Sequence, residues 1–136
     1  SKEDKEGLSL PEVTGTATLL VVDDEEMVLR LCKRMLSRLG CEIITASNGE
    51  EAIEIFRKNS DKIDAVLLDL SMPRMDGLTA FEELRKIDPR IRVILSSGYS
   101  KDVATSRFTG RGLAGFLEKP YRIDQLGEEL GRVLGE

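Results

Sequence analysis

The chain has 136 residues, 40% of them hydrophobic and 33% charged, and its formal net charge is −5, a balance typical of one soluble globular domain. The acidic charge argues against binding to nucleic acid, and no apolar run approaches the roughly 20 residues that span a bilayer. We therefore expect a cytoplasmic domain that contacts neither nucleic acid nor membrane.

Residues 1–17 are polar and contain turn-forming residues without a sustained period, so we expect a linker or arm followed by a folded domain at 18–136. In the folded domain, short apolar runs alternate with stretches of helical periodicity. The predicted strands are 19–22, 42–46, 63–68, 93–95 and 114–117, and the predicted helices are 25–39, a segment that begins at Ser47 or Asn48 and contains 52–56, then 78–87, 101–108 and 123–134.

This alternation predicts an α/β protein with a doubly wound parallel sheet, right-handed crossovers and helices on both faces. Cys32 and Cys41 fit this fold as small buried core residues, because their spacing does not match a metal site. Doubly wound folds bind ligands at the carboxyl ends of their strands. The residues that follow each strand are therefore the candidates for a functional site.

Polar residues stand at four of these strand ends. They are Asp23 and Asp24 after the first strand, Asp69 after the third, Ser96 and Ser97 after the fourth, and Lys119 after the fifth. Three crowded carboxylates repel each other unless a cation lies among them, and Mg²⁺ prefers oxygen ligands of this kind. Lys119 adds a positive charge for a carboxylate or an incoming anion, and Gly98 leaves space beside Ser97.

An anion at this edge would meet a metal ion, an ammonium group and a hydroxyl donor, which are the parts that phosphoryl transfer requires. The sequence contains no histidine, so a carboxylate remains as the nucleophile. Each residue also has a structural interpretation when it is taken singly. The acidic residues 23–25 can form a helix N-cap and first turn, Asp69 can open a loop, Ser97 can close a turn and Lys119 can lie on the surface. Their joint occurrence at strand ends favours a site.

Four segments carry a family resemblance: LLVVDDEE at 19–26, AVLLDLSMPRMDG at 65–77, VILSSGYS at 93–100 and GFLEKPY at 115–121. With them the chain resembles, from Leu19 onward, the receiver domains of bacterial response regulators. The resemblance implies a flavodoxin-like (βα)5 fold with the strand order 2-1-3-4-5. It also implies a Mg²⁺-dependent two-component phosphorelay whose partner is a histidine kinase or a histidine phosphotransfer protein.

The same resemblance implies a role for each residue of the site. Asp69 would be the phosphoacceptor and a metal ligand, Asp24 would ligate Mg²⁺ directly, and Asp23 would help through water. The backbone carbonyl of Ser71 would also bind the metal, and Lys119 would pair with the phosphoryl group. Such a domain is no enzyme beyond catalysing its own phosphorylation and dephosphorylation.

Other residues would carry the signal. Ser97 would bind a phosphoryl oxygen and move inward, and Phe116 would turn into the vacated space. This switch would alter the surface formed by the last two helices and the last strand, which is also the expected face for a homodimer. Ser71 and Tyr99 lie at positions where the family tunes the lifetime of the acyl phosphate.

Several contexts and alternatives stay open. The segments GTATLLVVDDEE, VILSSGYSKD and GLAGFLEKPYR look most like the receiver of a hybrid histidine kinase. A stand-alone regulator or a fragment of a longer one is the alternative. A phosphatase with an aspartate nucleophile would need a DxDx[TV] pattern at the first strand, which the residues at 23–25 do not supply. A pseudo-receiver that serves only for docking would normally have lost some acidic residues or Lys119.

Overall fold

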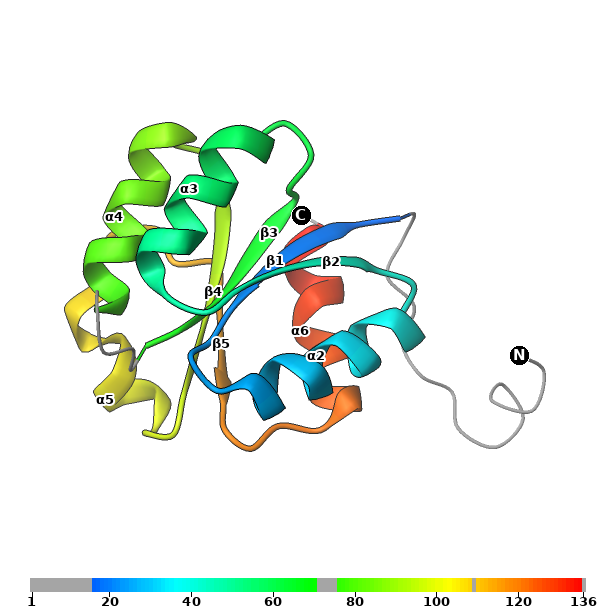
Figure 1. Cartoon of the computed structure of the whole chain (residues 1–136). Helices are drawn as coiled ribbons and strands as arrows, with labels where there is room; N and C mark the ends of the chain where they lie inside the picture. Colours follow the sequence, from blue (N-terminus) through cyan, green and yellow to red (C-terminus); the bar gives the residue numbers. More distant parts are fainter. Residues whose placement is uncertain (1–15, 71–75, 109, 136) are drawn as a thin grey trace.

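The computed structural model of the chain describes residues 16–70, 76–108 and 110–135. In this part of the chain, five strands alternate with five α-helices (Figure 1). The strands are β1 (Thr18–Val22), β2 (Glu42–Ala46), β3 (Ala65–Asp69), β4 (Arg92–Ser97) and β5 (Gly115–Glu118). The helices are α2 (Glu26–Arg38), α3 (Gly49–Asn59), α4 (Gly77–Ile87), α5 (Lys101–Thr105), continued by the 3-10 turn η1 (Ser106–Phe108), and α6 (Ile123–Leu134). Ser71 and residues 1–15 of the predicted linker lie outside the described residues.

The strands form one parallel sheet with the order β2-β1-β3-β4-β5. Helices α2 and α6 cover one face of this sheet, and α3, α4 and α5 cover the other (Figure 1). The predicted doubly wound α/β fold and its strand order are therefore confirmed. The chain order reverses at the neighbouring strands β1 and β3, so their carboxyl ends meet where such folds bind ligands.

Two apolar layers hold the helices on the sheet. Every residue of β3 is buried, as expected for a central strand that is covered on both faces. The layer under α3, α4 and α5 contains Phe56, Phe81 and Phe108, and the layer under α2 and α6 contains Leu36 and Leu130. Both cysteines belong to this second layer, as predicted. None of the helices within the described ranges is long and apolar enough to cross a membrane.

The largest departure from the predicted elements is the helix at 101–108. Helix α5 ends at Thr105, and the tighter turn η1 replaces its last residues. The hydroxyls of Thr105 and Ser106 donate to carbonyls about one turn earlier, at 2.7 and 3.1 Å, and such bonds compete with regular helix. Strands β4 and β5 extend further toward the site than predicted and end at Ser97 and Glu118.

Candidate functional site

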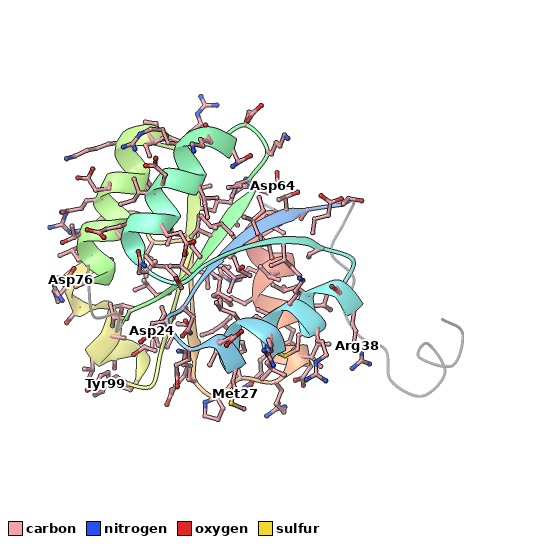
Figure 2. The ribbon with its side chains drawn as sticks, viewed as in Figure 1. Asp24, Met27, Arg38, Asp64, Asp76 and Tyr99 are labelled. Atoms are coloured by element: carbon pink, nitrogen blue, oxygen red, sulfur yellow. The ribbon has the colours of Figure 1, made fainter. Side chains whose placement is uncertain are left out.

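Three aspartates meet at the carboxyl ends of β1 and β3. Asp23 and Asp24 follow β1, and Asp69 is the last residue of β3. One oxygen from each carboxylate lies within 4.8 Å of the others. Asp23 and Asp69 are only 2% and 4% exposed, whereas Asp24 is exposed. Figure 2 shows Asp24 at this end of the sheet and Asp64 at the opposite end. The fold thus brings together the carboxylates that the sequence placed at this edge.

Asp23 also shapes the turn from β1 into α2. Its Oδ1 atom accepts a hydrogen bond from the backbone N–H of Glu25 at 3.0 Å. Glu25, rather than either aspartate, occupies the N-cap position of α2. The helix-start interpretation therefore holds for Glu25 and not for the two aspartates, and the second oxygen of Asp23 points to Lys119.

Lys119 neutralises part of the acidic cluster. It follows β5, where its backbone N–H donates to the carbonyl of Ser97 at 2.7 Å and its peptide bond to Pro120 is cis. Its Nζ atom lies 2.7 Å from Asp23 Oδ2 and 3.2 Å from Asp69 Oδ1, and its side chain is 20% exposed. Burial opposes the ammonium form, but the hydrogen bond to Asp23 and the charges of both carboxylates outweigh it and raise the pKa of Lys119.

The donor set of this cluster suits a hard divalent cation. The described residues of the cluster are three carboxylates and one ammonium group, that of Lys119, which contacts Asp23 and Asp69; negative charge is therefore in excess. A cation relieves such repulsion, and carboxylate oxygens are the ligands that Mg²⁺ prefers. Because oxygens of all three lie within reach of one ion, the residues present fit a magnesium site.

Ser97 stands on the strand next to the acceptor candidate. In the β3–β4 register, Asp69 lies beside Ser96, and Ser97 is the following residue. The Oγ atom of Ser97 accepts the backbone N–H of Tyr99 at 3.0 Å, so in this structure the side chain closes a turn. A Cβ atom at Gly98 would meet no atom of the described residues within 4 Å. Tyr99 itself is exposed.

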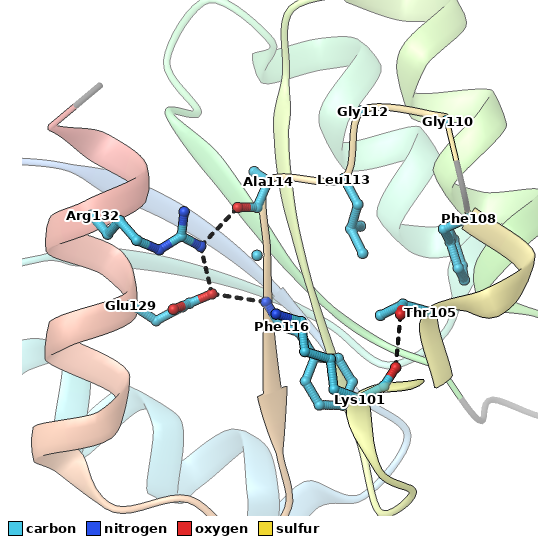
Figure 3. Close-up of a pocket in the computed structure, with 11 residues that line it drawn as sticks. Lys101, Thr105, Phe108, Gly110, Gly112, Leu113, Ala114, Phe116, Glu129 and Arg132 are labelled. Atoms are coloured by element: carbon cyan, nitrogen blue, oxygen red, sulfur yellow. Dashed lines mark hydrogen bonds and ion pairs between the residues drawn. The ribbon is translucent and has the colours of Figure 1, made fainter. Parts of the chain in front are cut away.

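Phe116 lies in β5, beside Leu95 of β4. Its ring is half-buried against the core on the α3–α5 side of the sheet. It also borders a hollow of about 580 Å³ between α5, β5 and α6, which Lys101 and Thr105 line from the α5 side (Figure 3). The aromatic ring thus has packed core on one side and open space on the other.

Sequence reasoning missed two pairs of side chains near these residues. The Sγ atom of Cys32 lies 3.0 Å from the Oη atom of Tyr121, which ties α2 to the segment after Lys119. Burial, together with the neighbouring Cys32, raises the pKa of Tyr121. On α6, Glu129 binds the backbone of β5 at Phe116, and Arg132 binds the carbonyl of Ala114, just before β5. Each pair joins two different elements, so no local pattern in the sequence signals it.

The model of the response regulator receiver domain family matches residues 19–130. The chain therefore belongs to this family. Receiver domains are switch modules that bind Mg²⁺ at an acidic pocket and interact with histidine kinases or phosphotransfer proteins, and this chain has such an acidic cluster.

Two relatives and one solved structure show the range of contexts. The sensor kinase CckA of Brucella abortus is 37% identical over 123 residues, which are 90% of this chain but 13% of the kinase. The chemotaxis protein CheY of Bacillus subtilis is 32% identical over 117 residues, which are 85% of this chain and 96% of CheY. The CheX–CheY–BeF3–Mg²⁺ complex of Borrelia burgdorferi matches with a TM-score of 0.79 at 30% identity, over 84% of this chain and 86% of that chain. The chain thus spans a small part of the kinase and nearly all of CheY.

Proposed function

We propose that this domain takes a phosphoryl group from a phosphohistidine of a partner protein onto Asp69 and passes on the resulting change of shape. In this step an oxygen of Asp69 bonds to phosphorus, and the bond from phosphorus to the partner's imidazole nitrogen breaks. Water later hydrolyses the acyl phosphate and restores the carboxylate. The observation that carries the proposal is the placement of Asp69, nearly buried beside two further carboxylates and an ammonium group.

The proposed metal ligands are Asp24, Asp69 and the backbone carbonyl of Ser71, with Asp23 acting through water. The clustering of the three carboxylates supports this assignment, and Ser71 rests on the family resemblance alone. When bound, Mg²⁺ would neutralise charge on the phosphoryl oxygens during transfer. The related CheY complex of Borrelia burgdorferi, which contains BeF3 and Mg²⁺, is consistent with this chemistry.

Lys119 and Ser97 would then hold the phosphoryl group. The ammonium of Lys119 already lies 3.2 Å from Asp69 and would exchange a carboxylate partner for a phosphoryl oxygen. The hydroxyl of Ser97 would leave the amide of Tyr99 and donate to another oxygen. Phe116 would follow into the space that Ser97 vacates and alter the surface of α5, β5 and α6, a local charge change read out by a bistable element.

The wider context is also a proposal. We place the domain in the cytoplasm as the receiver of a hybrid histidine kinase, supported by the likeness to the sensor kinase CckA. The likeness to CheY supports the alternative, a stand-alone regulator. A homodimer would use the α5-β5-α6 face. Ser71 and Tyr99 would set the lifetime of the acyl phosphate, and an unchanged dephosphorylation rate after substituting either residue would remove that assignment.

The decisive test is the intact mass of the protein after incubation with Mg²⁺ and acetyl phosphate. We expect the wild type to gain one phosphoryl group and Asp69→Asn to gain none. Asp64→Asn is the matched control, because Asp64 is an exposed aspartate just before the other end of β3, and it should be labelled like the wild type. Chelation of the metal should abolish the gain.

Each of the other outcomes would indicate a different function or a different acceptor residue. If the wild type takes up no phosphoryl group, the docking-only pseudo-receiver replaces the present proposal. Labelling of Asp69→Asn would place the acceptor elsewhere. Continuous turnover of p-nitrophenyl phosphate would favour a phosphatase with an aspartate nucleophile.

A further inference from the structure

Two side chains of α6 form hydrogen bonds with the backbone along the outer edge of β5 and just before it. This strand ends the sheet, so its outer backbone groups face away from β4. Glu129 Oε2 accepts the N–H of Phe116 at 2.8 Å, and Arg132 donates to the carbonyl of Ala114 at 2.9 Å (Figure 3). Arg132 also donates to the same oxygen of Glu129 at 2.8 Å. We call this arrangement of Glu129, Arg132 and the backbone of 114–116 the edge clamp. It occupies hydrogen-bonding groups that a further strand would otherwise take.

Gly115 makes room for the edge clamp. A Cβ atom at this position would collide with Glu129 Oε2 and crowd Arg132, so the carboxylate rests directly on the glycine. The side chain of Glu129 is only 20% exposed, which keeps its hydrogen bond to Phe116 partly shielded from water. An alanine at 115 would therefore push the carboxylate away without changing either charged residue.

The clamp and the acidic site hold the same short strand at its two ends. Lys119, one residue beyond β5, binds Asp23 and Asp69, while the clamp binds the backbone N–H of Phe116. A phosphoryl group on Asp69 would draw the ammonium of Lys119 to new oxygens and so pull on the end of β5. The clamp resists any such shift of the strand relative to α6, because both its bonds depend on that placement.

We propose that the edge clamp holds β5 in its unphosphorylated position and thereby opposes the switch, with Glu129 as a positioning residue. This proposal rests on the function proposed above, because it concerns the regulation of the same site. A contact that is stronger in the resting state weakens the binding of any ligand that favours the other state. Breaking the clamp must then make the acidic site bind a phosphoryl-like anion more tightly.

Beryllofluoride in the presence of saturating Mg²⁺ is the probe, titrated into ¹⁵N-labelled protein and followed by NMR. We expect Glu129→Ala and Gly115→Ala to bind it about 2- to 10-fold more tightly than the wild type, the factor that one net hydrogen bond supplies. Glu128→Gln is the control, since Glu128 is an exposed neighbour on the same helix, and its affinity should equal that of the wild type. The amide signal of Phe116 should shift in both clamp variants, reporting that its N–H has been released.

Titration with Mg²⁺ alone separates a positioning role from damage to the fold. The hydrogen bonds of the clamp do not include the three aspartates of the acidic cluster. The affinity for Mg²⁺ should therefore be the same in the wild type and the three variants. Equal or weaker binding of beryllofluoride in Glu129→Ala, with the Phe116 amide released, would overturn the clamp proposal alone. If the wild type binds no beryllofluoride, the proposed function itself fails, and this proposal fails with it.

Discussion

Lys119→Met is the substitution that most directly tests the electrostatics of the acidic site. It replaces the ammonium group by an apolar side chain of similar length, and it leaves Asp23 and Asp69 buried without this partner. Both carboxylates are at least 95% covered by protein, so water cannot easily take its place. We expect the folded state of the metal-free protein to lose stability.

The size of the loss follows from the two short contacts. At an effective dielectric constant of about 20, an ammonium 2.7 Å from one carboxylate and 3.2 Å from another is attracted to each by roughly 5 to 6 kcal/mol. The cost of taking the ammonium itself out of water offsets much of this attraction. Removing one partner of a buried ion pair typically costs about 3 to 5 kcal/mol, and we expect a loss in that range.

The assay is urea unfolding in EDTA, extended to a double-mutant cycle with Asp69→Asn. In the asparagine background one of the two carboxylates is already neutral, so Lys119→Met should cost about 1 to 3 kcal/mol less than in the wild type. Saturating Mg²⁺ should also reduce the cost, because the metal supplies positive charge to the same carboxylates. A loss below about 1 kcal/mol in EDTA, or additive effects in the cycle, would refute the pairing of Lys119 with Asp69.

Three further predictions follow from other contacts. Mg²⁺ at tenfold its dissociation constant should stabilise the wild type by about 1.4 kcal/mol in thermal unfolding, and Asp24→Asn should reduce this effect, whereas an equal shift in both would exclude Asp24 as a ligand. Asp76→Ala removes the N-cap of α4 and should cost about 1 kcal/mol at neutral pH. The backbone N–H of Thr79 donates to Asp76 and lowers the pKa of this carboxyl below its usual 3.8. The stability that the cap contributes should therefore be complete above pH 3.8 and be lost as the pH falls through the folded-state pKa. Cys32→Ala should lower the free energy of unfolding by about 1 kcal/mol more than Cys41→Ala, because Cys32 also forms a hydrogen bond with the hydroxyl of Tyr121. Equal losses in urea unfolding would contradict this.

Much of the fold was predictable because the hydrophobic period changes clearly along the chain. The short apolar run before Asp69 indicated a strand, and β3 is buried at every position. The helix at 101–108 was less predictable, because its hydroxyl-rich sequence offers competing bonds to its own backbone. Its replacement by a shorter helix and a 3-10 turn is a consequence of that competition.

The site was predictable to the extent that the topology alone places residues. Strand ends of a parallel sheet share one edge, so the meeting of Asp23, Asp24 and Asp69 followed from element order. Which carboxylate Lys119 contacts more closely did not follow, because it depends on the turn after β1 that points one oxygen of Asp23 toward the ammonium. The contact between Glu129 and Phe116 was equally hidden, since it depends on how α6 packs beside β5.

The proposed acceptor Asp69 and the proposed switch residue Phe116 lie on strands that differ in how tightly they are held. Asp69 ends β3, the central strand, which has a neighbouring strand on each side and a helical layer on each face. The closely packed residues around Asp69 therefore leave little room for movement when its charge changes. Phe116 lies on β5, a four-residue edge strand with β4 on one side and the hollow beside α5 on the other. A packed core responds to local strain by shifting between discrete arrangements at its less constrained elements. Lys119 connects the two strands, so a new charge at the centre of the sheet would act on the edge strand. Under the clamp proposal, the edge clamp would oppose the resulting shift of β5 and with it the turn of Phe116.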